Sequence, residues 1–594
     1  MKYELINQPN DKYSAKQQIF INRGIKEEDL VHYMNLTDND INPPEMLGED
    51  LLRGAAIEIK EAINENLEIC VVVDCDCDGY TSSAILINYL HDLAPVYTET
   101  HVHYFLHEGK QHGLQDCMDW IADCGADLVI IPDAGSNDWN ELDKLYQDGR
   151  AVIILDHHEI EGEAYPNCVL INSQLPQYPN KELSGAGVVW QFCRYMDKVF
   201  NINHANDYLD LAALGLVGDM MSLRSFETRQ IIFKGLEPDN IKNPFIYEMW
   251  QKNKFKLGDN PTTWGETFYI VPFVNAITRS GTLEEKDLIF SSMLKYKAFK
   301  QIPSNKRGHK IGEMERLVNQ AIRTCTNVKN RQGRDEEKAL ELVDHLIEDN
   351  HMMDHKVLLF LLEPGQIKPE IRGLVANKLM AKYQRPCCML TKTWNIDEKG
   401  KTLYGEVVYQ GSARGCDKVG VTDFKDICAE TQVCDYTIGH QGAFGLGLPQ
   451  DKIDAFVIST DEQLKDMSSE PIYYVDYIWS PAQVNKQAIL DIADMADMWG
   501  KDIDESLVAI QGIQVTKDNL TMMASNTVKI TLPNGISLIK FRMPDEEYDK
   551  LYSEYGFVEI DVIGRANCNL WNGIKYPQIL IDDMEIIGRC AYVF

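Results

Sequence analysis

Several short apolar runs in this sequence end on acidic or histidine side chains. The runs end at Asp74-Cys75-Asp76-Cys77-Asp78, at Asp133, at Asp156-His157-His158 and at Asp219. Apolar runs of about four to six residues, rich in β-branched side chains, predict strands that are buried on both faces, as in a parallel sheet. The ligand crevice of such a sheet lies at the carboxyl ends of its strands, so we expect these side chains to meet at one place.

This set of side chains predicts a metal site. Carboxylates gathered in one crevice repel one another and lose hydration unless divalent cations neutralise them. Oxygen ligands with one or two imidazoles favour Mn²⁺ or Mg²⁺, and two such ions would serve phosphodiester hydrolysis. A single Asp after a strand is more often a helix N-cap or a turn residue, but four such segments with βα spacing favour the metal site. Cys75 and Cys77 alternate with the acids and are expected to pack or to lie behind the ligands.

Composition indicates a multidomain globular protein. A chain of 594 residues is too long for one core, so three or four domains are expected. Neither a long apolar run nor an N-terminal signal segment is evident, and fifteen scattered cysteines argue against a disulfide framework, so we expect a cytoplasmic protein and no membrane contact.

The charge distribution contains one strongly basic stripe. The formal net charge is −33, which disfavours general binding to nucleic acid, yet residues 295–334 hold eleven basic and two acidic side chains. We expect Lys306, Arg307 and Lys310 in this stripe to contact DNA; the alternative is a solvated helix surface.

The pattern along the chain predicts an α/β protein in five parts. We expect a helical lead-in over 1–65, a doubly wound parallel sheet over 66–294, basic connecting helices over 295–350, a smaller α/β lobe over 351–460 and a β-barrel over 461–594. Within the connecting part, helices over 314–326 and 336–347 are predicted to flank a break at 327–334. In the last part a hairpin is predicted around Pro533-Asn534-Gly535, and Phe541, Trp571 and Tyr576 either stack on bases or belong to the core.

The order of the motifs resembles the DHH phosphoesterases, named for the Asp156-His157-His158 triplet, and among them the RecJ single-strand-specific DNA exonucleases. The resemblance covers nearly the whole chain. Besides the segments above, it rests on Asn22-Arg23-Gly24-Ile25, Leu183 to Gly187, Asn275-Ala276 with Arg279, Arg372 to Ala376, Gly411 to Arg414, Gly439-His440 with Gly445, Tyr576-Pro577-Gln578 and Ile581-Asp582-Asp583. It implies a two-lobed DHH phosphoesterase core, with a smaller DHH-associated α/β lobe and a C-terminal OB-like β-barrel.

Two positions depart from the family pattern. Val72 stands where many members carry a histidine, so one metal would be held more weakly or Asp74 would take over. Phe444 stands where a small residue is usual, which affects the expected shape of the substrate groove.

The motifs also divide the candidate residues by role. Asp76 and Asp78 are two residues apart on an expected strand end, so their side chains can each reach a different metal. The resemblance implies that Asp133 bridges the two ions and that His157 and Asp219 complete the ligands of the second metal. It places His158 near the phosphate with Asp156 orienting a histidine, and we assign Asp74 to the same catalytic group. For DNA it implies Ser412, Arg414, Gly439 and His440, while Asn275 and Arg279 guide the strand; for Arg279 an ion pair with one of the many acids is the alternative.

From this resemblance we expect a metal-dependent 5′-to-3′ exonuclease that hydrolyses single-stranded DNA to mononucleotides. We expect single-stranded DNA, a single-strand-binding protein or a helicase as partners, and a monomer. Two alternatives stay open: a DHH phosphodiesterase for short oligonucleotides or cyclic dinucleotides, and an inactive replication scaffold.

Overall fold

The computed structural model describes residues 1–109, 111–308, 310, 312–396, 402–467 and 470–591. The chain forms two compact units. Unit 1 comprises residues 1–22, 331–495 and 506–594, and unit 2 comprises residues 23–330 and 496–505.

A five-stranded parallel sheet forms the centre of unit 2. Its order is β3-β2-β4-β5-β6, with bounds β2 Ile69–Val73, β3 Val102–Leu106, β4 Leu128–Pro132, β5 Ala151–Asp156 and β6 Val169–Asn172. The strand order reverses between β2 and β4, and ligands of open α/β sheets bind at the carboxyl ends beside such a point. The segments that begin at Asp74 and Asp133 leave β2 and β4 there.

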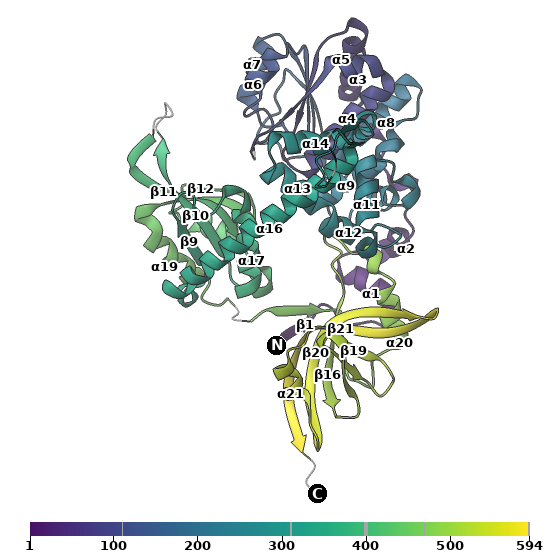
Figure 1. The fold of residues 1–594 in the computed structure, drawn as a ribbon, viewed down its shortest axis with the longest axis vertical. Helices are drawn as coiled ribbons and strands as arrows, with labels where there is room; N and C mark the ends of the chain where they lie inside the picture. Colours follow the sequence, from purple (N-terminus) through teal and green to yellow (C-terminus); the bar gives the residue numbers. More distant parts are fainter. Residues whose placement is uncertain (110, 309, 311, 397–401, 468–469, 592–594) are drawn as a thin grey trace. The chain divides into compact units, whose positions relative to one another are not determined.

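Helices cover both faces of this sheet, as the apolar strands require. Alternate residues Cys70 and Val72 of β2 pack in one cluster with Leu142 and Ile121, from α7 (Trp139–Gln147) and α6 (Met118–Asp123). The helices α4 (Cys77–Leu93) and α8 (Gly185–Phe200) contact the sheet at β4 and pack against each other. Figure 1 shows α6 and α7 on one side of the strands and α4 and α8 on the other. The predicted doubly wound sheet is therefore confirmed.

The remaining elements of unit 2 are mainly helical. Besides short 3-10 helices and the start of α16 (Leu317–Asp349), they are α2 (Leu30–Tyr33), α3 (Glu49–Glu65), α5 (Pro95–His101), α9 (Leu209–Gly218), α10 (Phe226–Gly235), α11 (Pro244–Leu257), α12 (Thr263–Tyr269), α13 (Val271–Ser280), α14 (Leu283–Met293), α15 (Lys295–Ala298) and the ribbon of β7 (Gln301–Pro303) and β8 (Met314–Arg316). None of the helices in the described part of the chain has the length and hydropathy that crossing a bilayer requires.

The predicted helix break at 327–334 is wrong. One helix, α16 (Leu317–Asp349), runs through the predicted break. It begins three residues after the predicted start at 314, because residues 314–316 form β8. The polar run contains no proline, and Val328, Gln332 and Glu336 continue the buried stripe at spacings of four residues. A single glycine, Gly333, costs only about 1 kcal/mol in a helix, so it does not interrupt one that is packed along this stripe.

Unit 1 contains two large sheets and the two-stranded pair of β1 (Lys2–Leu5) and β14 (Ile472–Val475) among its described strands. The first has the order β12-β13-β11-β10-β9, with bounds β9 Leu358–Leu362, β10 Cys387–Ile396, β11 Thr402–Arg414, β12 Tyr436–His440 and β13 Ala443–Pro449, and with helices α17 (Pro369–Tyr383), α18 (Phe424–Glu430) and α19 (Ile453–Gln463). This mixture of strands and helices is the α/β pattern that the sequence predicted for the smaller lobe. Thr460, at the predicted end of this lobe, is a buried residue inside α19.

The second sheet of unit 1 has seven strands. Its order is β15-β16-β20-β21-β19-β18-β17, with bounds β15 Tyr477–Trp479, β16 Leu507–Val515, β17 Leu520–Met523, β18 Thr527–Thr531, β19 Ser537–Lys540, β20 Gly556–Trp571 and β21 Ile574–Ala591, and with helices α20 (Lys486–Ala493) and α21 (Asp545–Leu551). The predicted hairpin is β18–β19. The two edges, β15 and β17, are not paired with each other among the described strands, so the sheet is OB-like without a closed barrel.

The N-terminus also contributes to unit 1. Strand β1 (Lys2–Leu5) pairs in parallel with β14 (Ile472–Val475), and α1 (Ala15–Asn22) follows it. The lead-in is otherwise helical as expected, but β1 was not predicted, because a four-residue strand carries too little periodicity to be identified from sequence.

Candidate metal centre

The loop after β2 places three carboxylates at the start of α4. Asp76 is the N-cap of α4, where its side chain accepts a hydrogen bond from the Gly79 N–H at 3.0 Å. Asp78 lies in the first turn of α4 and is buried. Asp76 and Asp78 therefore lie at the start of a helix, and not at the strand end that the sequence predicted.

Asp78 is fixed by the N-terminus of another helix, α8. Its carboxylate accepts hydrogen bonds from the Ser184 hydroxyl at 2.8 Å, the Gly185 N–H at 2.6 Å and the Ala186 N–H at 3.1 Å. The partial positive charge of a helix N-terminus favours a carboxylate there. Asp78 therefore has a defined orientation before any cation binds.

Asp133 follows β4 in an unusual conformation. Its φ is +67°, in the left-handed region, and its side chain is buried. The absence of a side chain at Gly185 leaves room for it, because a Cβ there would lie 2.4 Å from Asp133 Oδ1 and 2.5 Å from its Cβ. Left-handed backbone at a non-glycine residue is uncommon and occurs often at functional sites.

The DHH triplet separates its two histidines by role. Asp156, the last residue of β5, accepts hydrogen bonds from the N–H groups of His157 at 2.7 Å and of His158 at 3.2 Å. It also lies 2.8 Å from His158 Nδ1. Burial would raise the pKa of Asp156, but the His158 hydrogen bond and charge hold that pKa far below its usual range. Conversely, burial lowers the pKa of His158, but Asp156 outweighs burial and raises it to about 9.

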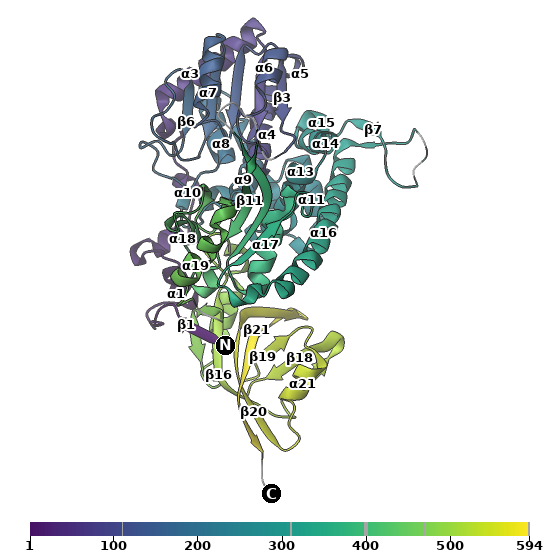
Figure 2. The same ribbon diagram turned by 90° about the vertical axis from the view of Figure 1, so that its left-hand side faces the viewer.

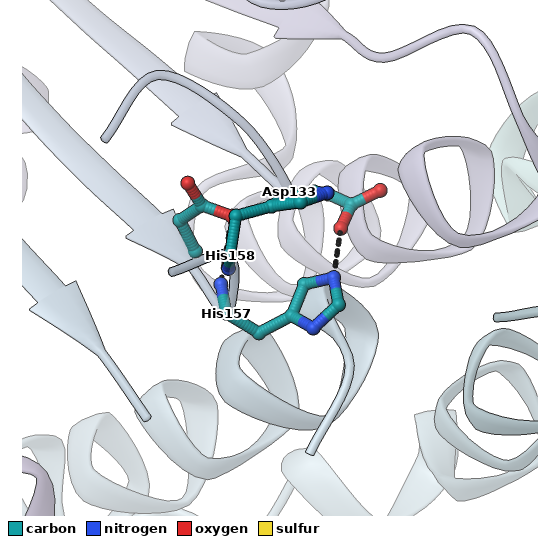
Figure 3. Close-up of side chains that lie close together, drawn as sticks. Asp133, His157 and His158 are labelled. Atoms are coloured by element: carbon teal, nitrogen blue, oxygen red, sulfur yellow. Dashed lines mark hydrogen bonds and ion pairs between the residues drawn. The ribbon is translucent and has the colours of Figure 1, made fainter. Parts of the chain in front are cut away.

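His157 turns the other way, toward the carboxylates. Its Nε2 lies 3.2 Å from Asp133 Oδ1, 3.4 Å from Asp219 Oδ2 and 3.9 Å from Asp78 Oδ2. Figure 3 shows the ring directed at the Asp133 carboxylate. Burial lowers the pKa of His157, which favours the neutral ring that binds metals.

Asp219 reaches this centre from a helix. The fourth apolar run, 214–217, lies inside α9 and not in a strand, and Asp219 is the C-cap of that helix. The strand prediction was wrong because α9 as a whole is rich in leucine and alanine, which favour helix, and has one β-branched residue, Val217. Helix α9 is buried on all sides, so its apolar residues show no helical period in the sequence.

The side chains form two sets of possible ligands. The ligand atoms of Asp78, His157 and Asp219 lie within 4.8 Å of one another, and so do those of Asp74, Asp76 and Asp133. The contact between His157 and Asp133 joins the two sets. Two adjacent groups of oxygen and imidazole ligands are the arrangement that two divalent cations require.

The electrostatics fit a pair of cations. Burial, followed by repulsion from nearby carboxylates, raises the pKa of Asp133 well above its usual range, that of Asp219 to about 8 and that of Asp76 to about 6. Asp133 Oδ1 and His157 Nε2 are buried and have no hydrogen-bond partner among the residues described. Buried polar atoms left without partners are costly, and Mn²⁺ or Mg²⁺ would both satisfy them and neutralise the acids.

The two cysteines of the first loop are buried. Burial and the adjacent acids raise the pKa of Cys75 to about 12 and that of Cys77 well above its usual range, so both thiols stay protonated. A Cβ on Gly218 would meet the Cys77 Cβ at 3.0 Å, which places Cys77 against α9.

Sequence reasoning missed one neighbour of this centre, His112. Its Nδ1 lies 2.8 Å from Asp74 Oδ2, and Asp74 Oδ1 accepts the Gly113 N–H at 3.1 Å. The Asp74 hydrogen bond raises the pKa of His112. A lone histidine in a loop carries no periodic signal, so only the fold places it here. Val72, at the position where the family usually has histidine, is buried in the cluster under α6 and α7 and does not reach the ligands.

The predicted DNA-binding residues of the smaller lobe lie on β11 and β12 in unit 1. Ser412 and Arg414 lie close together, since a Cβ on Gly373 would be 3.7 Å from Ser412 Oγ and 2.4 Å from Arg414 Nη2. Gly439 and His440 are exposed at the end of β12. The Phe444 side chain packs in the lobe's core against Phe424, so its size does not narrow the exposed surface.

Other predicted DNA contacts belong to unit 2. Asn275 and Arg279 lie on α13, and no ion pair of Arg279 is found in the described part of the chain. The charge of Arg279 works to lower the pKa of the Cys75 thiol, so Arg279 lies near the loop that follows β2. In the stripe, Lys306, Arg307 and Lys310 are exposed and lie between β7 and β8 in the sequence. Figure 2 shows β7 extending away from the helices α14 and α15. Arg323 instead pairs with Glu315.

The three aromatic residues of the OB-like sheet are exposed. Phe541 is 58%, Trp571 65% and Tyr576 45% exposed, which excludes the core alternative. They line a groove of about 510 Å³ together with Lys486 and Lys529.

Comparisons with known proteins agree with this architecture. The DHH family, N-terminal domain, matches residues 68–216, and the RecJ OB domain matches residues 475–583. YorK from the SPbeta prophage of Bacillus subtilis strain 168, whose name places it with single-strand DNA-specific exonucleases, is 32% identical over 99% of this chain and 98% of YorK. RecJ of the same bacterium is 24% identical over 93% of this chain and 65% of that RecJ. The crystal structure of RecJ from Thermus thermophilus in complex with Mn²⁺ superposes with a TM-score of 0.68 at 18% identity, covering 96% of this chain and 75% of that chain.

The fold and the centre of carboxylates and histidines define the class, a metal-dependent DHH phosphoesterase. Because the likeness to YorK extends over almost the full length of both proteins, the chain belongs to the RecJ-like family of single-strand DNA-specific exonucleases within that class.

Proposed function

We propose that this protein is a 5′-to-3′ exonuclease that hydrolyses single-stranded DNA to mononucleotides with two Mn²⁺ or Mg²⁺ ions. The observation that carries the proposal is the 3.2 Å contact between His157 and Asp133, which joins two sets of buried and half-buried ligands into one centre. The inactive-scaffold alternative is disfavoured because all five assigned ligands face this centre. The oligonucleotide or cyclic dinucleotide phosphodiesterase has no specific observation in its favour.

The side chains of the metal centre would bind the ions and act on the phosphate. Asp76, Asp78, Asp133, His157 and Asp219 would hold the ions, with Asp133 between them. When bound, the ions neutralise the phosphoryl oxygens and promote attack by water. His158, which Asp156 orients through Nδ1, presents its other nitrogen to the solvent side, where it stabilises charge on the phosphate or protonates the leaving oxygen.

The DNA strand would be bound through both backbone and bases. We assign backbone phosphates to Ser412, Arg414, Gly439 and His440, since an arginine suits a phosphate through paired N–H donors. Asn275 and Arg279 would guide the strand, and Lys306, Arg307 and Lys310 would add electrostatic attraction. The protein would act as a monomer divided into the five parts given above, with a single-strand-binding protein or a helicase as partner.

The groove of the OB-like sheet gives the first prediction. In the β20–β21 ribbon Trp571 pairs with Ile574 and Asn569 with Tyr576, so Trp571 and Tyr576 share one face while Leu570 lies on the other. We expect Trp571→Ala and Tyr576→Ala each to weaken binding of a long single strand by about 1–3 kcal/mol, because each removes a stacking surface. Fluorescence anisotropy with a strand of about 30 nucleotides, longer than one OB-fold site, measures this.

Leu570→Ala is the matched control, since Leu570 is as exposed as Trp571, at 65%. It should change affinity by less than about 0.5 kcal/mol. If all three substitutions weakened DNA binding equally, the aromatic residues would not bind DNA by stacking, and the groove would serve only the structure of the sheet.

Product analysis tests the proposed activity. A single strand labelled at its 5′ end should release labelled mononucleotide at once in Mn²⁺, whereas a 3′ label should stay in long products until late. A blunt duplex should persist, and chelation of the metal should stop the reaction. Cleavage of the duplex at the same rate, or activity only on dinucleotides, would contradict the proposal.

A further inference from the structure

The segment between β3 and α6 is fastened beside the metal centre. The buried Lys286 ammonium donates hydrogen bonds to the carbonyls of His107 at 2.7 Å and Glu108 at 2.8 Å. At the other end the Leu114 N–H donates to Asp138 at 2.8 Å, and the Leu114 side chain lies in the core. These contacts hold the backbone on either side of His112.

Asp74 then fixes His112 itself. One carboxylate oxygen accepts the Gly113 N–H at 3.1 Å and the other lies 2.8 Å from His112 Nδ1. Asp74 is buried, whereas the His112 side chain is 60% exposed. The ring is therefore anchored through Nδ1, and Nε2 is its only other polar atom.

The same construction occurs at the DHH triplet. His158 Nδ1 lies 2.8 Å from the buried Asp156, and its side chain is 53% exposed. Asp74, which holds His112, also lies in one ligand set with Asp76 and Asp133. The ligand atoms of Asp133 and His158 lie within 4.8 Å of one another, so both imidazoles lie beside the Asp133 carboxylate. Two exposed imidazoles, each oriented by a buried carboxylate through Nδ1, thus lie beside the same group of ligands.

We propose that His112 is a second imidazole of the active site, whose Nε2 contacts a phosphate oxygen of the bound DNA next to the scissile bond. This inference rests on the proposed exonuclease function. A substrate contact is favoured over metal ligation because the only ligand set of the described residues that includes His112 is Asp74, Cys75 and His112. The Cys75 thiol is buried and a poor ligand for Mn²⁺ or Mg²⁺, which prefer oxygen.

The experiment compares His112→Ala with His103→Ala in the full-length protein. His103 is a suitable control because it is also a histidine paired with an acid, Glu68 at 2.7 Å, and its side chain is 40% exposed on β3, outside the site. We expect His112→Ala to raise the KM for single-stranded DNA about tenfold, the usual size of a lost hydrogen bond to a charged group. Its melting temperature and its Mn²⁺ affinity, measured by calorimetric titration without DNA, should match the wild type.

Chemical rescue separates contact from structural support. Because the side chain is exposed, imidazole in the buffer can enter the space left by His112→Ala, and it should lower the KM toward the wild-type value. An unchanged KM, a loss of Mn²⁺ affinity, or a lower melting temperature without imidazole rescue would each overturn the inference. Wild-type protein that fails to hydrolyse single-stranded DNA in the same assay would instead overturn the proposed function.

Discussion

Replacing Asp133 by asparagine should reduce hydrolysis of single-stranded DNA at least about 10³-fold, because several kcal/mol of transition-state stabilisation depend on the paired ions and each 1.4 kcal/mol is tenfold. Asparagine has the shape of aspartate and tolerates the φ of +67° at this position, so the change removes the bridging charge and leaves the backbone intact. Single-turnover hydrolysis in Mn²⁺ measures the effect. DNA affinity should remain near that of the wild type, since none of the assigned phosphate-binding side chains is altered.

The same variant should show an opposite effect on stability. Burial and repulsion from nearby carboxylates raise the pKa of Asp133, so without metal the neutral asparagine is expected to stabilise the fold and to raise the melting temperature. Mn²⁺ should stabilise the wild type much more than the variant, through binding to the native state. Wild-type turnover, or equal stabilisation of both proteins by Mn²⁺, would exclude the bridging role.

Gly185→Ala should damage the centre without changing a ligand. The new Cβ would lie 2.4 Å from Asp133 Oδ1, too close for any side-chain carbon, so Asp133 must move. A displacement of about 1 Å at reacting groups can cost about 10²-fold in rate, and forced repacking costs about 1–3 kcal/mol of stability. Steady-state kinetics and denaturant unfolding measure the two effects.

Gly54→Ala is the matched control for this prediction. Gly54 lies in α3, and its nearest neighbour to an added Cβ is Val169 Cγ2 at 4.0 Å, an ordinary contact. Alanine there should stabilise the protein by about 0.5–1 kcal/mol and leave the rate unchanged. If Gly185→Ala behaved like Gly54→Ala, the close packing of α8 on Asp133 would have no catalytic importance.

The sequence was sufficient for the parts of the site that local patterns encode. Apolar β-branched runs in β2, β4 and β5 identified the parallel sheet, because a strand buried on both faces cannot carry polar residues. The position of Asp133 and Asp156 after such runs then placed them at one edge of the sheet. The hairpin β18–β19 could also be predicted from the sequence, because its turn residues are flanked by strands in which apolar and polar side chains alternate.

Local patterns failed where packing decides the conformation. The run before Asp219 is helical because α9 is buried on every side, and apolar residues all around a helix look the same in sequence as a buried strand. Likewise α16 continues through a polar segment because Val328, Gln332 and Glu336 lie on its buried face.

Only the tertiary structure determined how the ligands divide and what surrounds them. Asp76 and Asp78 separate into two sets because one caps α4 while the other is held by the N-terminus of α8, more than 100 positions away in the sequence. His112 joins the centre through a loop fastened by Asp74. Residue types fix which groups can bind a cation, but distances between them depend on how helices and loops that are remote in sequence pack around one sheet.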